Sequence, residues 1–137
     1  MFQRIAATVL FVRDLARCVT FYRDVLGLQV TESTHELASF HMENVYFLLL
    51  EVSAAAHMVS EDASVLKIEG GPRGMLAAGV EDVDAAYEAL KAKGVTLLRP
   101  PTTQSWGLRT AYFADPEGNI WEINQPVASS EEEAKPL

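Results

Sequence analysis

Two glutamates lie within apolar segments of this sequence, and they are the residues best suited to chemistry. Glu51 lies within Leu48-Leu49-Leu50-Glu51-Val52, and Glu122 lies within Ile120-Trp121-Glu122-Ile123. Two carboxyl groups that lie close together raise each other's affinity for protons, and burial adds to this effect. Such a pair would hold a proton or attract a cationic ligand. The alternative is that both are solvated acids at strand ends without a chemical role.

Other residue types that act as metal ligands or nucleophiles are sparse. The spacing is too wide for a zinc finger or ribbon among the three histidines, His35, His41 and His57. His41 falls on a predicted strand, where it is either a metal ligand or a polar residue at the edge of the sheet. Cys18 lies on an apolar helical stripe without a neighbouring base, which predicts a buried thiol. Taken alone, Trp106 and Arg109 indicate a surface loop with an aromatic anchor.

Composition narrows the classes of partner. The 137 residues carry a formal net charge of -8, which argues against binding nucleic acid or anionic membrane surfaces. No apolar run approaches the roughly 20 residues that a membrane-spanning helix needs. A single cysteine excludes an intramolecular disulfide. We therefore expect a soluble, cytoplasmic protein that binds a cationic or neutral small molecule.

The elements that position these residues occur in an order that repeats. Asp14 and Asp82 are predicted N-caps of two amphipathic helices, which end at Gly27 and Gly94. Short runs rich in apolar or β-branched residues predict the strands 5–12, 29–33, 37–41, 44–52, 75–80, 95–99, 108–114 and 119–124. Each half is therefore predicted to be one strand, one helix and three strands.

The two halves also align residue by residue. Val12-Arg13-Asp14-Leu15 corresponds to Val80-Glu81-Asp82-Val83, 68 residues later. This repeat predicts an α+β fold of two βαβββ modules, about 4–52 and 73–125, whose curved mixed sheets form a cleft. Together they would form one domain, 1–126, with a linker over 53–72 that lies against the surface and a flexible acidic tail over 127–137.

Two stretches closely resemble signatures of the vicinal oxygen chelate superfamily, which contains glyoxalases, bleomycin resistance proteins and extradiol dioxygenases. One is Val12 to Leu15 followed by Phe21-Tyr22-Arg23-Asp24-Val25-Leu26-Gly27-Leu28, and the other is Asp115-Pro116-Glu117-Gly118-Asn119-Ile120-Trp121-Glu122. The resemblance covers roughly residues 4 to 125. It implies paired βαβββ modules that often assemble as dimers, so we expect a homodimer.

The resemblance also implies four positions for a divalent metal, on the first and fourth strand of each module. The first-strand positions, which are often histidine in metal-binding members, hold Ala7 and Met75, and neither is a ligand for a hard metal. At the fourth strands Glu51 and Glu122 match the acidic ligands. Because a catalytic site needs about three protein ligands, we expect no metal cofactor. If a metal does bind, its ligands would be Glu51, Glu122 and His41.

Alternation along the strands predicts which side chains face the cleft. The expected set is Ala7, Val9, Phe11, Phe47, Leu49, Glu51, Met75, Ala77, Gly79, Ile120, Glu122 and Asn124. Trp121 alternates with these residues and is expected on the helix side, in the core.

Three functional hypotheses follow. The leading one is a metal-independent protein, similar to bleomycin resistance proteins, that binds an aromatic or cationic compound such as an antibiotic. The residues expected to bind the ligand are Phe11, Phe47, Glu51, Met75, Trp106, Arg109 and Glu122. The alternative is a metal-dependent lyase, isomerase or dioxygenase that chelates its substrate. The third is a module for dimerisation or regulation that binds no ligand.

Overall fold

The computed structural model describes residues 2–127 except 63, 65 and 73. The chain divides into two compact units, Met1–Gly71 and Pro72–Leu137. Across the described residues, none of the helices combines the length and the apolar character needed to span a bilayer. The predicted acidic tail lies outside the described residues except for Val127.

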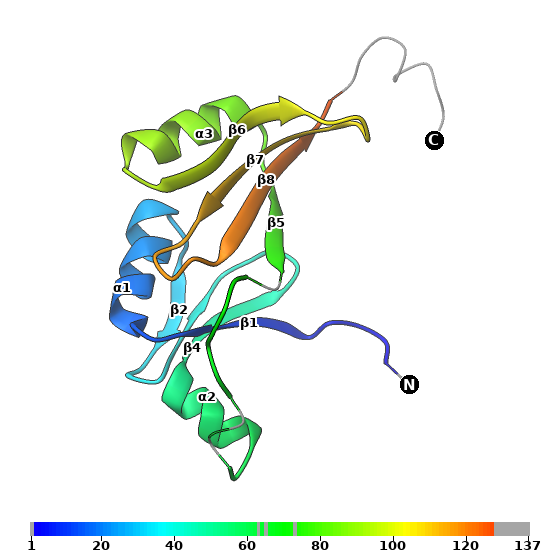
Figure 1. The fold of residues 1–137 in the computed structure, drawn as a ribbon. Coiled ribbons are helices and arrows are strands. Elements are labelled where there is room, and N and C mark those ends of the chain that lie inside the picture. Colours follow the sequence, from blue (N-terminus) through cyan, green and yellow to red (C-terminus); the bar gives the residue numbers. More distant parts are fainter. Residues whose placement is uncertain (1, 63, 65, 73, 128–137) are drawn as a thin grey trace. The chain divides into compact units, whose positions relative to one another are not determined.

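Unit 1 follows the predicted order of one strand, one helix and three strands, and adds one more helix (Figure 1). Its elements are β1 (Ala7–Val12), α1 (Leu15–Thr20), the π-helical turn η1 (Phe21–Val25), β2 (Val30–Ser33), β3 (Leu37–Phe40), β4 (Tyr46–Glu51) and α2 (Val52–Val59). Helix α2 occupies the start of the predicted linker, which the sequence patterns did not indicate. Asp14 caps α1 as predicted, since its carboxyl accepts a hydrogen bond from the amide of Arg17.

The sheet of unit 1 has the strand order β1-β4-β3-β2, with β1 parallel to β4 and the other neighbours antiparallel. One face packs on α1 and η1 through a cluster of aromatic rings. Tyr22 lies 5.5 Å from Phe47 and 5.7 Å from Phe40, measured between ring centroids. All three side chains are buried, so this cluster is the core of the unit.

Unit 2 repeats the same order. Its elements are β5 (Met75–Gly79), α3 (Val83–Ala92), β6 (Thr96–Thr103), β7 (Leu108–Ala114) and β8 (Ile120–Pro126). The sheet order β5-β8-β7-β6 matches that of unit 1, and β5 is parallel to β8 as β1 is to β4. Two four-stranded mixed sheets, each with its own helix, confirm the predicted α+β fold of βαβββ modules.

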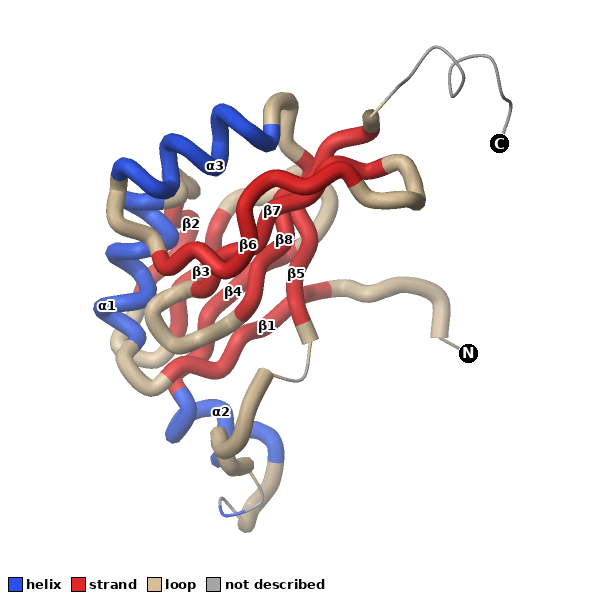
Figure 2. Tube along the Cα trace, turned by 45° about the horizontal axis from the view of Figure 1, so that its top comes forward, coloured by secondary structure: helices blue, strands red, loops and turns tan. Residues whose placement is uncertain are grey.

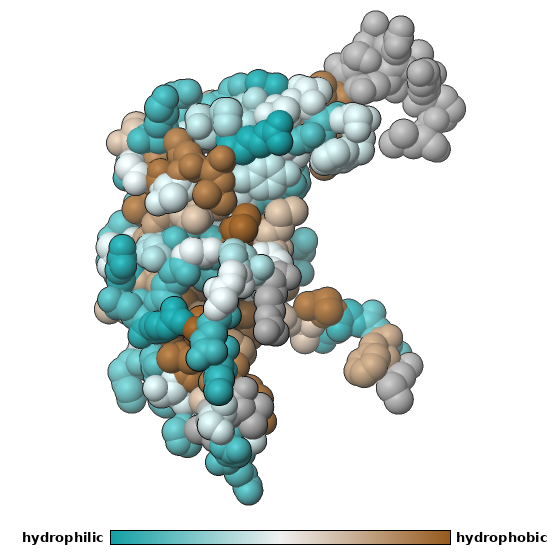
Figure 3. All heavy atoms as spheres, in the orientation of Figure 1, coloured by the Kyte–Doolittle hydropathy of each residue, from teal (hydrophilic) through white to brown (hydrophobic). Residues whose placement is uncertain are grey.

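Helix α3 covers one face of the second sheet (Figure 2). Val83 and Leu90 are its buried residues, and beneath it the ring of Phe113 stacks on Trp121. Trp121 therefore lies in the core, as predicted. The outward side of α3 carries exposed Asp84, Glu88 and Lys91, and hydrophilic side chains cover this part of the surface in Figure 3.

Asp115 organises the turn that joins β7 to β8. One of its carboxyl oxygens accepts hydrogen bonds from the amides of Glu117 and Asn119, and the other accepts one from the Asn119 side chain. Gly118 takes a positive φ of 84°, which favours glycine. The turn predicted from Asp-Pro-Glu-Gly is confirmed, and it fixes the start of β8 ahead of Glu122.

Candidate functional site

The register of the second sheet shows which side chains share a face with Glu122. Neighbouring Cα partners carry their side chains on the same face of a sheet. Glu122 pairs with Ala77 on β5 and with Tyr112 on β7, and Tyr112 pairs with Arg99 on β6. These four residues form a row across the sheet, on the face opposite α3.

Two further rows flank this one. The first runs through Thr96, Ala114, Ile120 and Met75, and the second through Thr102, Thr110, Asn124 and Gly79. The β5 and β8 residues predicted to lie together do share one face of the sheet: Met75, Ala77, Gly79, Ile120, Glu122 and Asn124. On β5 the three residues of this face are exposed, with Met75 at 52%. This face therefore combines a polar centre with accessible apolar side chains.

Glu122 is the centre of a hydrogen-bond network on this face. The Tyr112 hydroxyl donates to Oε1 of Glu122 at 2.7 Å, and the Asn124 amide donates to Oε2 at 2.7 Å. Only 7% of Glu122 is exposed. A carboxyl group with a donor on each oxygen is fixed in one orientation, so Glu122 is a preorganised polar group rather than a solvated acid.

Thr110 lies two residues before Tyr112 on the same face of β7, and its side chain accepts a hydrogen bond of 3.0 Å from the Gln104 amide. Interaction with Thr110 acts to lower the pKa of Tyr112, but the hydrogen bond to Glu122 and burial outweigh it, and the pKa is raised overall. Tyr112 therefore keeps its proton and remains the donor to Glu122 at neutral pH.

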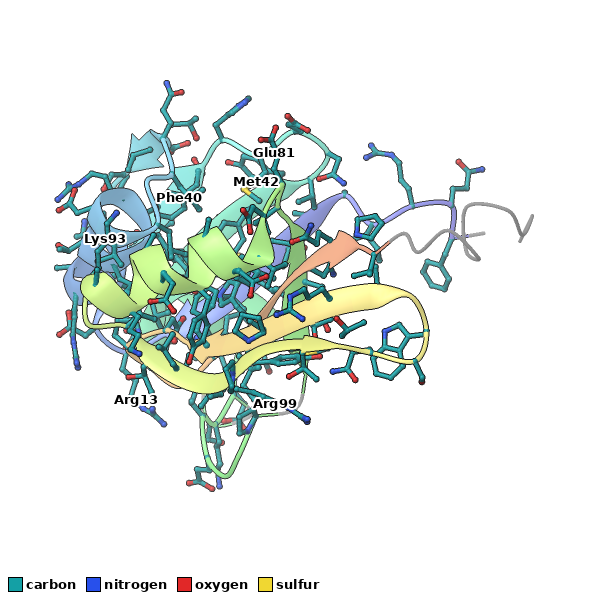
Figure 4. All side chains as sticks on the ribbon, turned by 90° about the horizontal axis from the view of Figure 1, so that it is seen from above. Arg13, Phe40, Met42, Glu81, Lys93 and Arg99 are labelled. Atoms are coloured by element: carbon teal, nitrogen blue, oxygen red, sulfur yellow. The ribbon has the colours of Figure 1, made fainter. Side chains whose placement is uncertain are left out.

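Arg99 reaches this face because of a β-bulge. Leu97 pairs with Phe113, whose ring lies under α3, whereas Arg99 pairs with Tyr112 on the other face. Strict alternation would have placed Leu97 and Arg99 on the same face, and the register shift between them reverses Arg99. Figure 4 shows Arg99 on the side of β6 away from α3. Its side chain is exposed, and its charge acts on Tyr112.

In unit 1 the predicted face of β4 is wrong by one residue. Phe47 pairs with Thr8 and Glu51 pairs with Val12, so both lie on the face of the sheet opposite Ala7, Val9 and Phe11. Phe47 is 2% exposed and contacts Tyr22 of the helix, which makes it a core residue and not a ligand contact. On β4 the residues that share a face with Phe11 are Tyr46, Leu48 and Leu50.

Glu51 has a local structural role that explains its position at the end of β4. Its carboxyl accepts hydrogen bonds from the amides of Ser53 at 2.9 Å and Ala54 at 3.3 Å, and it is the N-cap of α2. The Ser53 amide contributes most to lowering the pKa of Glu51, and burial opposes this only in part. The carboxyl of Glu51 is therefore used to start a helix.

The symmetry of the two sheets identifies the true counterpart of Glu122. Ala77 is the partner of Glu122, its equivalent in unit 1 is Val9, and the partner of Val9 is Leu48. The prediction that Glu51 occupies the position equivalent to Glu122 is therefore wrong, and with Leu48 in its place the four positions are Ala7, Leu48, Met75 and Glu122. Glu122 alone offers a hard oxygen ligand, and a catalytic metal needs about three protein ligands. These residues do not fit a divalent metal.

The remaining residues singled out from the sequence lie in different places. Arg109 is on the helix face of β7, where its guanidinium forms two hydrogen bonds to Asp84 and a third to Thr103, so it lies on the opposite face from Glu122. Trp106 is 64% exposed in the turn between β6 and β7. His41 is exposed just after β3. Among the described residues no cluster of three or more His, Cys, Asp or Glu side chains is arranged to hold a metal.

Unit 1 also contains a hollow of about 750 Å³ beside α1. Arg13, Arg23, His35 and the acids Asp14 and Glu51 contribute to its lining. Both acids cap helices, Arg23 forms a salt bridge with Asp24, and Arg13 donates to the carbonyl of Ile68. The two arginines and the two acids of this hollow are therefore engaged within unit 1, which makes the Glu122 face the stronger candidate.

A model of the glyoxalase/bleomycin resistance protein/dioxygenase superfamily matches residues 4–123, nearly the whole of both units. The chain belongs to this superfamily. Among superfamily relatives, the uncharacterised protein YraH of Bacillus subtilis is 36% identical over 117 residues, which cover 83% of this chain and 91% of YraH. A lactoylglutathione lyase of Haemophilus influenzae is 33% identical over 119 residues, which cover 84% of this chain and 87% of the lyase.

Solved structures agree with this membership. A glyoxalase/bleomycin resistance protein/dioxygenase from Nocardioides superposes with a TM-score of 0.74 at 27% identity and covers 94% of this chain and 87% of its own. A glyoxalase-related enzyme from Fulvimarina pelagi gives a TM-score of 0.75 at 28% identity, with coverages of 90% and 88%. The superfamily fold therefore extends over both units.

Proposed function

We propose that this superfamily member is a metal-independent binding protein for a small organic molecule, and that the ligand docks on the Glu122 face of the second sheet. The observation that carries the proposal is the set of side chains at the four strand positions that the family resemblance assigns to a metal. Of the four equivalent strand positions, three hold Ala7, Leu48 and Met75, which cannot replace the water shell of a hard cation.

The environment of Glu122 supports the same proposal. A carboxyl group offers about four lone-pair sites, and Tyr112 and Asn124 use one on each oxygen. Glu122 can therefore accept further hydrogen bonds from a ligand without reorganising. Exposed Met75 and half-buried Ile120 lie beside it on the same face and would contact the apolar part of the ligand.

The proposal is tested by ligand binding to protein that has been stripped of metal and kept in chelator. A panel of aromatic amines and aromatic antibiotics would be screened by thermal shift, and compounds that raise Tm would be measured by calorimetry. We expect at least one compound to bind without metal, and Glu122→Gln to weaken it. Glu88→Gln, a surface change on α3, is the matched control.

The result that would contradict metal-independent binding is equally clear. If metal-stripped protein binds nothing in the panel, and binding appears once a divalent metal is added, the metal-independent function is wrong.

A second candidate function is a metal-dependent lyase of the superfamily. The observation that favours it is the 33% identity to the lactoylglutathione lyase of Haemophilus influenzae. Such an activity would need metal ligands beyond Glu122. A glyoxalase assay with glutathione and methylglyoxal, on protein supplied with nickel or zinc, distinguishes the two candidates, because the binding protein is expected to show no turnover.

We also infer that the protein acts in the cytoplasm as a homodimer. The single cysteine, Cys18, is fully buried, which is consistent with a protein that needs no disulfide. Light scattering on the purified protein tests the dimer, and a monomer across micromolar concentrations would contradict it.

A further inference from the structure

We propose that the ligand of this face carries both an anionic group and a protonated nitrogen, with Arg99 binding the first and Glu122 the second. This inference rests on the proposed function, because it concerns the ligand of the same face. It assigns the ligand to the class of small zwitterions that have an apolar or aromatic spacer.

The first support is the placement of opposite charges in one row. Arg99, Tyr112 and Glu122 are successive Cα partners on β6, β7 and β8. Neighbouring strands are about 4.8 Å apart, so the two charged residues stand on strands separated by about 10 Å. A small molecule with a charged group at each end can span that separation and lie across Tyr112.

The second support is that Glu122 retains hydrogen-bond acceptors for a ligand, whereas Arg99 retains hydrogen-bond donors. Each carboxyl oxygen of Glu122 retains acceptor capacity for a ligand N–H, as its two existing donors come from Tyr112 and Asn124. Arg99 is exposed, and within the described part of the chain no salt bridge engages it. Its planar guanidinium is suited to bind a carboxylate or phosphate through paired hydrogen bonds.

The third support is the contrast with Arg109. Arg109 lies ten residues further along the chain, and its guanidinium is hydrogen-bonded to Asp84 and Thr103 on the helix face. The bulge before Arg99 instead turns that arginine toward the row of Glu122. Bulges frequently re-aim a side chain beside a functional site. Arg99 therefore has the position and the available donors that Arg109 lacks.

The test uses three related probes with metal-stripped full-length protein. 4-(Aminomethyl)benzoate carries both charges, benzylamine carries the cation alone, and benzoate carries the anion alone. We expect the two-charge probe to bind at least tenfold more tightly than either single-charge probe. Arg99→Gln should abolish most of its advantage over benzylamine and leave the affinity for benzylamine within about twofold.

Two further variants make the result specific. Arg99→Lys keeps a positive charge and should retain part of the preference for the two-charge probe. Arg109→Gln removes a guanidinium that is already paired on the other face and should leave the preference unchanged. Arg99 is exposed, so its variants should fold, and circular dichroism with thermal unfolding checks that they do.

Several outcomes would overturn the assignment. Equal binding of benzylamine and the two-charge probe to the wild-type protein would show that the anionic group is not recognised. An unchanged preference in Arg99→Gln would show that another residue recognises it. If none of the three probes binds to metal-stripped protein that does bind other compounds, the zwitterion class is rejected but the proposed function is not. If binding requires added metal, the proposed function itself is rejected.

Discussion

The hydroxyl of Tyr112 donates a 2.7 Å hydrogen bond to Oε1 of Glu122 from the neighbouring strand. The two residues are Cα partners, so the contact follows from the register of β7 and β8. The carboxyl of Glu122 is held by protein donors, Tyr112 and Asn124, so its geometry is set before any ligand arrives.

Removing that donor should destabilise the protein. Tyr112→Phe leaves a carboxyl oxygen of the 7%-exposed Glu122 without its partner, which we expect to cost about 1–3 kcal/mol in the free energy of unfolding. Urea unfolding followed by tryptophan fluorescence measures the change. The control is Tyr46→Phe at a half-exposed tyrosine, which should stay within about 0.5 kcal/mol. Equal effects of the two changes would contradict a structural role for the Tyr112 hydroxyl.

Phe47 should behave as a core residue. Its ring is packed between Tyr22 and Phe40, so Phe47→Ala is expected to lower the free energy of unfolding by about 3–5 kcal/mol. Phe47→Leu should restore much of that loss. A mild effect of Phe47→Ala on stability together with a large effect on ligand affinity would show that Phe47 contacts the ligand and would contradict its role as a core residue.

The N-cap of α2 can be tested at Glu51. Glu51→Ala removes the acceptor for the Ser53 and Ala54 amides and should cost about 1 kcal/mol. Glu51→Asp keeps a capping carboxylate and should retain most of the stability. If both variants were as stable as the wild type, the cap would contribute nothing.

The same group predicts a dependence of stability on pH. The pKa of Glu51 is lowered by folding, chiefly by the Ser53 amide, so the unfolded chain binds more protons between the folded and the unfolded value. The contribution of Glu51 is therefore complete above the unfolded pKa of about 4.3 and is lost as the pH falls through the lower folded value. The stability difference between wild type and Glu51→Ala should shrink from pH 6 to pH 3, and a constant difference would contradict the assignment.

Much of the fold was predictable because local signals agreed. Asp14 and Asp82 were identified as helix caps from their place before apolar stripes, and both accept a hydrogen bond from the amide three residues later. The face of β8 was also predicted correctly, since Glu122 alternates with the buried residues Trp121 and Ile123. A strand with one polar and one apolar face reveals its register in the sequence.

Strand β4 has no such alternation, and the prediction failed there. Residues from Tyr46 to Leu50 are apolar on both faces, so nothing local indicated that Phe47 faces the helix. The family resemblance predicts Glu51 as the counterpart of Glu122 because both are acids on a fourth strand, whereas the role of Glu51 depends on the helix that follows. That helix lies in a segment whose composition suggested a linker.

Arg99 and Tyr112 could not have been found from sequence patterns for a different reason. A bulge inserts a residue without any mark in the composition, so alternation from Leu97 assigns Arg99 to the wrong face. Tyr112 becomes visible only through its pairing with Glu122. Pairing between strands is a tertiary property, and it was the decisive information for this site.

The most direct test of the account is the metal content of the protein. Purified protein would be incubated with nickel, zinc, manganese or ferrous iron, freed of loosely bound ions and analysed by elemental analysis, beside the Glu122→Ala variant. Metal-independent binding predicts far less than one ion per chain and no difference between the two proteins. Near-stoichiometric retention that Glu122→Ala abolishes would contradict it.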